Sequence, residues 1–184
     1  MKSKILAQAA EAIIYKKDDF VIKDRIPKSY RIKILDDKIR KSRTKSEIKL
    51  LTKASSIINA PSPIEDNSLG AGGRRNEITQ IKMPFIDGKK LSEHLNDFPE
   101  EKQKQICEKI GESTAKLHDA NIIHGDLTTS NMILVEREKN DKKTSSSLTV
   151  SPGRVIGGSD GGTRVYFIDF GLGFISHKLE DKAV

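Results

Sequence analysis

The sequence has 184 residues, which suits one domain or two small lobes that share one fold. Its 33 Lys and Arg residues against 26 Asp and Glu give a formal net charge of +7. The single cysteine, Cys107, excludes an internal disulfide framework and a cysteine-based zinc cluster, and it favours a reducing compartment. No stretch approaches the roughly 18 consecutive apolar residues of a membrane-spanning helix, so we expect no membrane partner.

The positive charge is concentrated in residues 23–53. This segment holds twelve basic and four acidic residues, a net charge of +8, while the rest of the chain sums to −1. A localised basic patch attracts polyanions such as tRNA. A solvated helix face kept soluble by lysines explains the same charge equally well, because no aromatic residues are interleaved to stack bases.

The first half of the chain predicts a small sheet and one long helix. Alternating apolar residues predict strands over 10–16 and 20–26, joined by a turn at KKDD and ended by Pro27. Asp36 is placed to cap a helix over about 36–54. The polar, turn-rich stretch 61–76 reads as a loop, and 78–86 returns to strand alternation. We assign residues 1–84 to an N-terminal lobe.

The second half predicts a helical lobe over residues 85–184. A short helix over 91–98 precedes a longer one at about 100–119 that Pro99 can open, with apolar residues at helical spacing. Residues 121–136 read as strand, loop and strand, and VYFIDFGLGFI as a buried strand that breaks at Gly171. Between them, 137–163 is rich in Ser, Thr and Gly and is expected to be a disordered insertion in a hairpin connection.

The residues that carry chemistry lie at the ends of these last strands. His124, Asp126 and Asn131 have the spacing H-x-D-x-x-x-x-N, and Asp169 begins a D-F-G about forty residues later. Together they form the catalytic-loop and metal-loop pair of protein-kinase-like enzymes. Asp126 is the expected catalytic base for the attacking hydroxyl. Asn131 and Asp169 are the expected ligands of Mg²⁺, which prefers a few protein oxygens together with phosphates.

The upstream half supplies a candidate ATP-binding set. Lys23 follows an apolar run where the kinase β3 lysine is expected, and Glu47 falls on the helix face of Leu50 and is its natural partner. No G-x-G-x-x-G loop precedes Lys23, so Glu11, at the corresponding turn, is a candidate nucleotide contact, with a surface strand residue as the equal alternative. Met83 is also assigned to the nucleotide-binding set.

Two further departures separate this chain from ordinary protein kinases. Position 125 is Gly where H-R-D has the arginine that pairs with a phosphorylated activation loop. Only thirteen residues follow Gly171, without A-P-E, so we expect neither an activation segment nor a peptide-substrate platform. Switching by loop phosphorylation is therefore not expected.

The segments AEAIIY, KDRIPKSYRI, LDDKIRKSRTKSEIKLL, HGDLTTSNMI and IDFGLGFIS, in this order, resemble the small atypical kinase subunit of the KEOPS (EKC) complex, a family related to the Rio kinases. The resemblance implies an α+β, minimal two-lobed protein-kinase-like fold, use of ATP and Mg²⁺, and autophosphorylation or ATP hydrolysis. It also implies assembly with the threonylcarbamoyl-transferase subunit and other KEOPS subunits, a role in making threonylcarbamoyladenosine on tRNA, and cytoplasmic and nuclear localisation. The family continues past EDKAV, so we expect a truncated C-lobe.

Three other functions use the same residues. A stand-alone serine/threonine protein kinase needs a peptide-substrate platform, which we do not expect in this chain. A small-molecule phosphotransferase of the aminoglycoside or choline kinase kind needs a large helical C-lobe. A pseudokinase, a non-catalytic binding subunit, is disfavoured because Lys23, Glu47, Asp126, Asn131 and Asp169 are all present, whereas truncation favours it.

Overall fold

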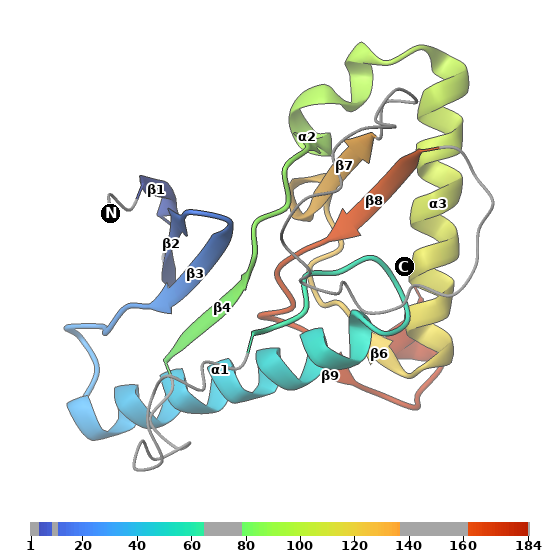
Figure 1. Ribbon diagram of the computed structural model, residues 1–184. Coiled ribbons are helices and arrows are strands. Elements are labelled where there is room, and N and C mark those ends of the chain that lie inside the picture. The colour runs from blue at the N-terminus through green and yellow to red at the C-terminus, as the bar shows by residue number, and fades with distance from the viewer. Residues whose placement is uncertain (1–3, 9–10, 65–78, 137–161, 184) are drawn as a thin grey trace.

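The computed structural model describes residues 4–8, 11–64, 79–136 and 162–183 (Figure 1). It has two lobes. One consists of an antiparallel sheet and one long helix, and the other consists of a second long helix packed against short strands. The first lobe contains β1 (Lys4–Gln8), β2 (Ala12–Lys17), β3 (Phe20–Arg25), α1 (Lys33–Ala54) and β4 (Gln80–Pro84). The second contains β5 (Lys89–Lys90), α2 (Leu91–His94), α3 (Glu100–Asp119), β6 (Ile122–Ile123), β7 (Met132–Glu136), β8 (Thr163–Phe167) and β9 (Phe174–Ile175).

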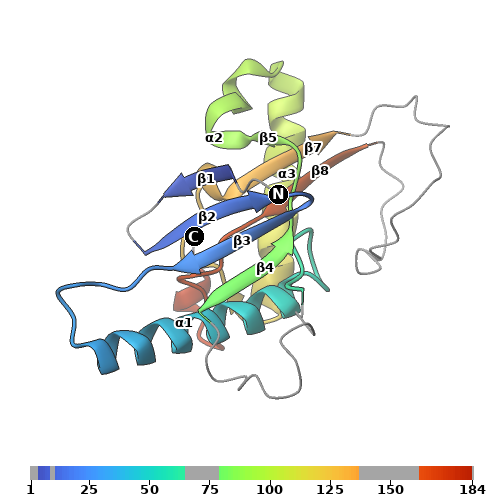
Figure 2. The same ribbon diagram turned by 60° about the vertical axis from the view of Figure 1, so that its left-hand side comes forward.

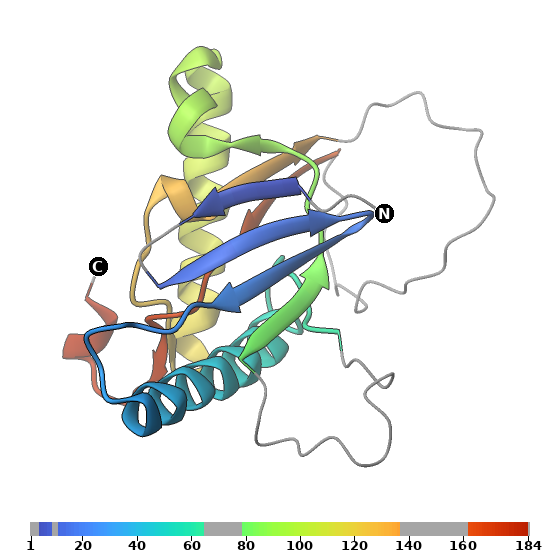
Figure 3. The same ribbon diagram turned by 90° about the vertical axis from the view of Figure 1, so that its left-hand side faces the viewer.

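The first-lobe sheet has the order β1–β2–β3–β4, and α1 runs across one side of it (Figures 2 and 3). Lys23 of β3 pairs with Ile14 of β2 and with Ile81 of β4. Because directly paired residues share one face and side chains alternate along a strand, Val21 and Arg25 lie on the same face as Lys23. Burial of Ile81 on this face shows that the face with Lys23 points into the protein.

Helix α1 begins at Lys33, earlier than the predicted start at Asp36, and its N-cap residue Ile32 makes no side-chain cap. The expectation that Asp36 caps the helix is wrong. Its carboxylate lies in the first turn and accepts hydrogen bonds from Arg40 (2.7 Å) and Arg31 (3.4 Å). The hydrogen bond from Arg40 lowers the pKa of Asp36.

The predicted inward face of α1 is confirmed. Glu47, Leu50, Leu51 and Ala54 are all buried, and they recur at the spacing that places side chains on one helix face. The apolar members join the main hydrophobic cluster, which continues into the second lobe. Helix α1 therefore packs against both lobes and carries Glu47 with it to their junction.

The second lobe is organised around α3, which matches its predicted span, and the β5–β7–β8 sheet. Ile106 and Leu117 of α3 are fully buried in the common core with Phe167 of β8. The predicted break of the last strand at Gly171 is wrong, because β8 ends at Phe167. The next residues turn sharply, and only Phe174–Ile175 pair again, with β6.

Several expectations lie outside the described residues. These are most of the loop 61–76 and all but the last two residues of 137–163. No helix in the described part of the chain is long and apolar enough to cross a membrane.

Candidate nucleotide and metal site

The predicted catalytic loop connects β6 to β7 and is shaped by Gly125. This residue has φ of +79°, and a Cβ there would lie 2.2 Å from the carbonyl oxygen of Leu172. Positive φ and backbone crowding both exclude a side chain. The loop of this chain therefore has no room for the arginine that H-R-D kinases carry at this position.

His124 joins the two predicted loops. Its Nε2 lies 3.1 Å from the carbonyl oxygen of Ile168, which only accepts, so Nε2 carries the proton. Nδ1 then accepts the backbone N–H of Asp126 at 3.4 Å. The ring also packs on buried Phe170 at 4.5 Å between centroids. Burial lowers the pKa of His124, which keeps the ring neutral as these two contacts require.

Asp126 and Asn131 lie together, as their spacing predicts. The Asn131 amide nitrogen donates to a carboxylate oxygen of Asp126 at 2.9 Å and to its backbone carbonyl at 3.0 Å. These bonds fix the orientation of both side chains while Asp126 stays exposed. The amide oxygen of Asn131 is thereby turned away from Asp126, which leaves it suitable for a cation.

Asp169 follows β8 in a left-handed conformation, with φ of +63°. Its Oδ1 accepts the Gly171 N–H at 3.1 Å and contacts Lys23 Nζ at 2.6 Å. Burial by itself raises the pKa of Asp169, but the charge and hydrogen bond of Lys23 outweigh it, so the net pKa is lowered. Asp169 is thus an ionised carboxylate at the mouth of the site, with a side chain that is 43% exposed.

The predicted contact between Lys23 and Glu47 is present. Lys23 Nζ lies 2.8 Å from Glu47 Oε1, and the two side chains are 8% and 1% exposed. Sequence reasoning missed a second cation, Arg25, whose Nη2 lies 2.6 Å from Glu47 Oε2. The signal was available, since Arg25 is two residues after Lys23 on a strand and shares its face.

The two remaining candidates occupy different positions. Glu11 immediately precedes β2 and forms ion pairs with Arg43 (2.8 Å) and Arg31 (3.7 Å), so it ties the start of β2 to the α1 region. Met83 pairs with Val21 and lies on the face of Lys23. Their contact with a nucleotide stays a prediction.

The donor set fits Mg²⁺. Asp169 and the Asn131 amide offer hard oxygen ligands from two loops, and Mg²⁺ typically takes one or two carboxylates plus substrate phosphates. Among the described residues, no group of three or more His, Cys, Asp or Glu could hold a metal ion by itself. Such a site is complete only when phosphate oxygens supply the remaining ligands.

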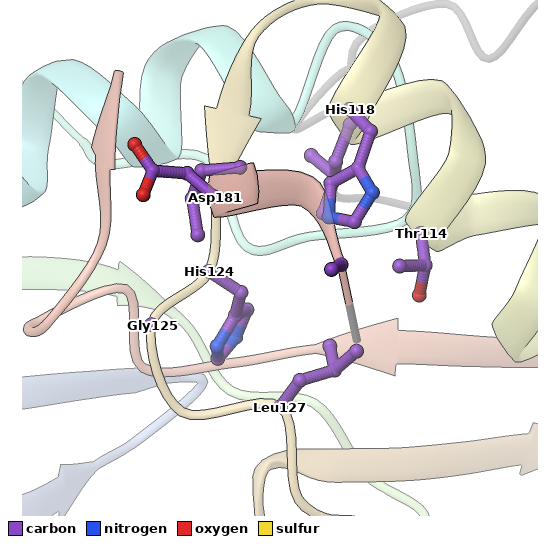
Figure 4. Close-up of a pocket in the computed structure, with 9 residues that line it drawn as sticks. Thr114, His118, His124, Gly125, Leu127 and Asp181 are labelled. Carbon is purple, nitrogen blue, oxygen red and sulfur yellow. The ribbon is translucent and has the colours of Figure 1, made fainter. Parts of the chain in front are cut away.

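A separate cavity of about 170 Å³ lies beside the catalytic loop (Figure 4). Thr114 and His118 of α3, His124 and Gly125 of the loop, and Asp181 line it. None of Lys23, Glu47 or Asp169 lines this cavity. It is therefore distinct from the candidate nucleotide site.

The fold is similar to that of the Rio2 kinase from Chaetomium thermophilum, with a TM-score of 0.63 and 15% sequence identity, over 98% of this chain and 50% of the other. A family model described as the lipopolysaccharide kinase (Kdo/WaaP) family matches residues 23–148. The fold and this match define a protein-kinase-like protein, as the sequence predicts.

Curated relatives narrow the class. The KEOPS complex subunit Bud32 of Pyrococcus abyssi is 35% identical over 98% of this chain and 72% of its own length. A probable bifunctional tRNA threonylcarbamoyladenosine biosynthesis protein of Methanobrevibacter smithii is 37% identical, over the whole of this chain but 28% of its own length. The chain belongs to the Bud32 family, and the Kdo/WaaP kinase family model also matches it.

Proposed function

We propose that the chain binds Mg²⁺ and ATP at the junction of its two lobes and transfers or hydrolyses the terminal phosphoryl group. The observation that supports this most directly is the contact of Lys23 with both Glu47 and Asp169, which brings β3, α1 and the loop after β8 to one point. Phosphoryl transfer needs positioned charge more than covalent chemistry, and this cluster is a positioned set of charges.

Each residue then has a distinct task. Lys23 donates to the phosphates while Glu47 orients its ammonium group. Asp169 and Asn131 would hold Mg²⁺, which would neutralise charge on the phosphates. Asp126, fixed by the Asn131 amide, accepts the proton of the attacking hydroxyl or water. Met83 and Glu11 would contact the nucleotide.

We further propose that this activity serves a KEOPS complex in forming threonylcarbamoyladenosine on tRNA, in the cytoplasm and nucleus. Support comes from the relatives, one named a KEOPS subunit and one named for threonylcarbamoyladenosine biosynthesis. The partners would be the threonylcarbamoyl-transferase subunit and the other KEOPS subunits. Serine/threonine protein kinase activity on separate proteins is the second candidate, and the same residues support it.

The deciding experiment follows γ-labelled ATP with the purified chain, alone and with the transferase subunit plus tRNA. Release of free phosphate only with partner and tRNA supports an ATPase subunit. Label on protein without a partner supports a stand-alone kinase. Asp126→Asn is the matched control because it keeps the side-chain volume and removes the base. No turnover by the complex, or equal turnover by Asp126→Asn, contradicts the proposal.

Of the basic segment 23–53, only the lysine-rich face of α1 supports a contact with tRNA. Lys23 and Arg25 are buried in the site, and Arg40 is paired with Asp36 and Asp37. Five lysines remain on the α1 face opposite Glu47: Lys38, Lys41, Lys45, Lys49 and Lys53. They extend over about 22 Å of helix, a suitable length for several phosphates.

The tRNA contact is tested with Lys45→Glu/Lys49→Glu in the assembled complex. We expect weaker tRNA binding and a smaller salt slope, by about two units of log–log slope. Lys116→Glu on α3 is the control for a general charge effect. Unchanged affinity and slope in the double variant would contradict a contact along α1.

A further inference from the structure

Arg25 is a buried cation that the proposed function does not yet use. It lies on the same face of β3 as Lys23, and the two cations divide the Glu47 carboxylate between them. Lys23 takes Oε1 at 2.8 Å and Arg25 takes Oε2 at 2.6 Å. The Arg25 side chain is 5% exposed. A carboxylate as deeply buried as Glu47 requires a cationic partner at all times.

Lys23 and Arg25 differ in the other groups with which they interact. Lys23 also contacts Asp169 Oδ1 at 2.6 Å, so its ammonium group is already shared. In the proposed function it must also turn toward phosphate oxygens. Among the described residues, Arg25 forms an ion pair with Glu47 and with no other carboxylate. Arginine also keeps its charge at every physiological pH.

The main chain of Arg25 is held from both sides. Its N–H donates to the carbonyl oxygen of Thr79 at 3.2 Å, next to β4. Its carbonyl oxygen accepts from Arg40 Nη1 at 3.4 Å, and Arg40 is itself bound to Asp36. Arg40 and Glu47 are about 10 Å apart along α1. The end of β3 is thus joined to two positions of α1, to Arg40 through the Arg25 carbonyl and to Glu47 through the Arg25 side chain.

We propose that Arg25 is a positioning residue that holds Glu47, and with it α1, in place while nucleotide phosphates engage Lys23. The inference rests on the proposed function, because it requires Lys23 to be drawn toward a nucleotide. In protein kinases the placement of the corresponding helix is a point of control. Here Arg25 keeps α1 docked without a signal, in agreement with a catalytic loop that sterically excludes the H-R-D arginine.

The test is hydrogen exchange of the α1 amides of the full chain, with and without saturating Mg²⁺–ADP. In the wild type we expect protection around residues 44–51 to stay equal or rise when nucleotide binds. In Arg25→Met we expect nucleotide to lower it by about tenfold or more, because Glu47 then loses Lys23 and has no second cation. Arg25→Lys keeps a cation and should change by about twofold or less.

The nucleotide dependence separates positioning from plain structural support. If Arg25→Met lowers protection equally with and without Mg²⁺–ADP, Arg25 is only structural and the inference is wrong. If Arg25→Met does not fold, Arg25→Met/Glu47→Gln replaces it, since removing the carboxylate charge removes the need for a cation. Recovery of folding in that double variant supports the inference, and failure to fold overturns it.

A second arm needs no nucleotide and so separates this inference from the proposed function. We expect Lys23→Met alone to leave α1 protected to within about twofold of the wild type, because Arg25 still holds Glu47. Lys23→Met/Arg25→Met should lose far more than the two single variants combined. Release of α1 by Lys23→Met alone overturns the inference. A wild type that binds no Mg²⁺–ADP contradicts the proposed function instead.

Discussion

The catalytic loop and the cation–carboxylate cluster form one site but are held together in opposite ways. Asp126 is exposed and Asn131 is half-buried, and the two residues lie five positions apart and are joined by local hydrogen bonds. Lys23 and Arg25 of β3 and Glu47 of α1 are buried, and Asp169 lies 146 residues after Lys23. A change in the exposed loop should therefore affect chemistry, whereas a change in the buried cluster should affect folding as well.

The largest effect is expected at the buried cluster. Glu47→Ala leaves Lys23 and Arg25 as buried cations without their carboxylate, which should lower the free energy of unfolding by about 3–5 kcal/mol. Denaturant titration of the full chain measures this. Glu112→Ala, at an exposed position of α3, is the control and should change stability by about 0.5 kcal/mol or less. Equal stabilities would show that the cluster is not energetically significant.

Asp126→Asn should show the reverse pattern. Removing a catalytic base is expected to lower ATP turnover by about 10²–10⁴-fold. Stability should move by about 0.5 kcal/mol or less, because the side chain is exposed and keeps its shape. Turnover with labelled ATP and a denaturant titration test the two halves. A large loss of stability would mean that the loop is structural.

Gly125→Ala tests the local support of the same loop. The new Cβ meets the Leu172 carbonyl oxygen and must adopt positive φ, so we expect a loss of about 1–3 kcal/mol. The matched control is Gly111→Ala in α3, where a Cβ meets nothing within 4 Å. That change should stabilise the chain by about 0.5–1 kcal/mol. Thermal unfolding measures the stability of both variants. If Gly125→Ala is not destabilised, position 125 is not as crowded as the structure indicates.

The smallest effect concerns pH and His124, which lies between the two regions. Burial lowers the pKa of His124 in the folded chain from the ordinary 6.5. Below pH 6.5, His124 is therefore protonated more readily in the unfolded chain than in the folded chain. Stability should therefore fall as pH drops below 6.5, by at most about 1.4 kcal/mol per pH unit. His124→Asn should reduce this slope, and His118→Asn is the control. An unchanged slope in His124→Asn would assign the acid sensitivity to other groups.

Local pattern alone predicted much of this molecule. Apolar alternation located β2, β3 and β4, helical spacing located α3 to the residue, and motif spacing brought Asp126 and Asn131 together. The prediction places the start of α1 too late, because Asp36 lies inside the first turn, where it binds the nearby Arg40 and Arg31 instead of capping the helix. The predicted end of β8 is too late because the apolar run continues past the strand into a turn, of which only Phe170 is buried.

The sequence by itself determined the class of fold, the two loops and the identity of the charged residues, because these depend on spacing along a few residues. Only the tertiary structure decided that Arg25 shares Glu47 with Lys23, that Glu11 binds arginines, and that position 125 has no room for a side chain. Each of these depends on segments far apart in the chain. Contact between such segments follows from packing, and a local pattern indicates at most which residues share a face, as it does for Lys23 and Arg25.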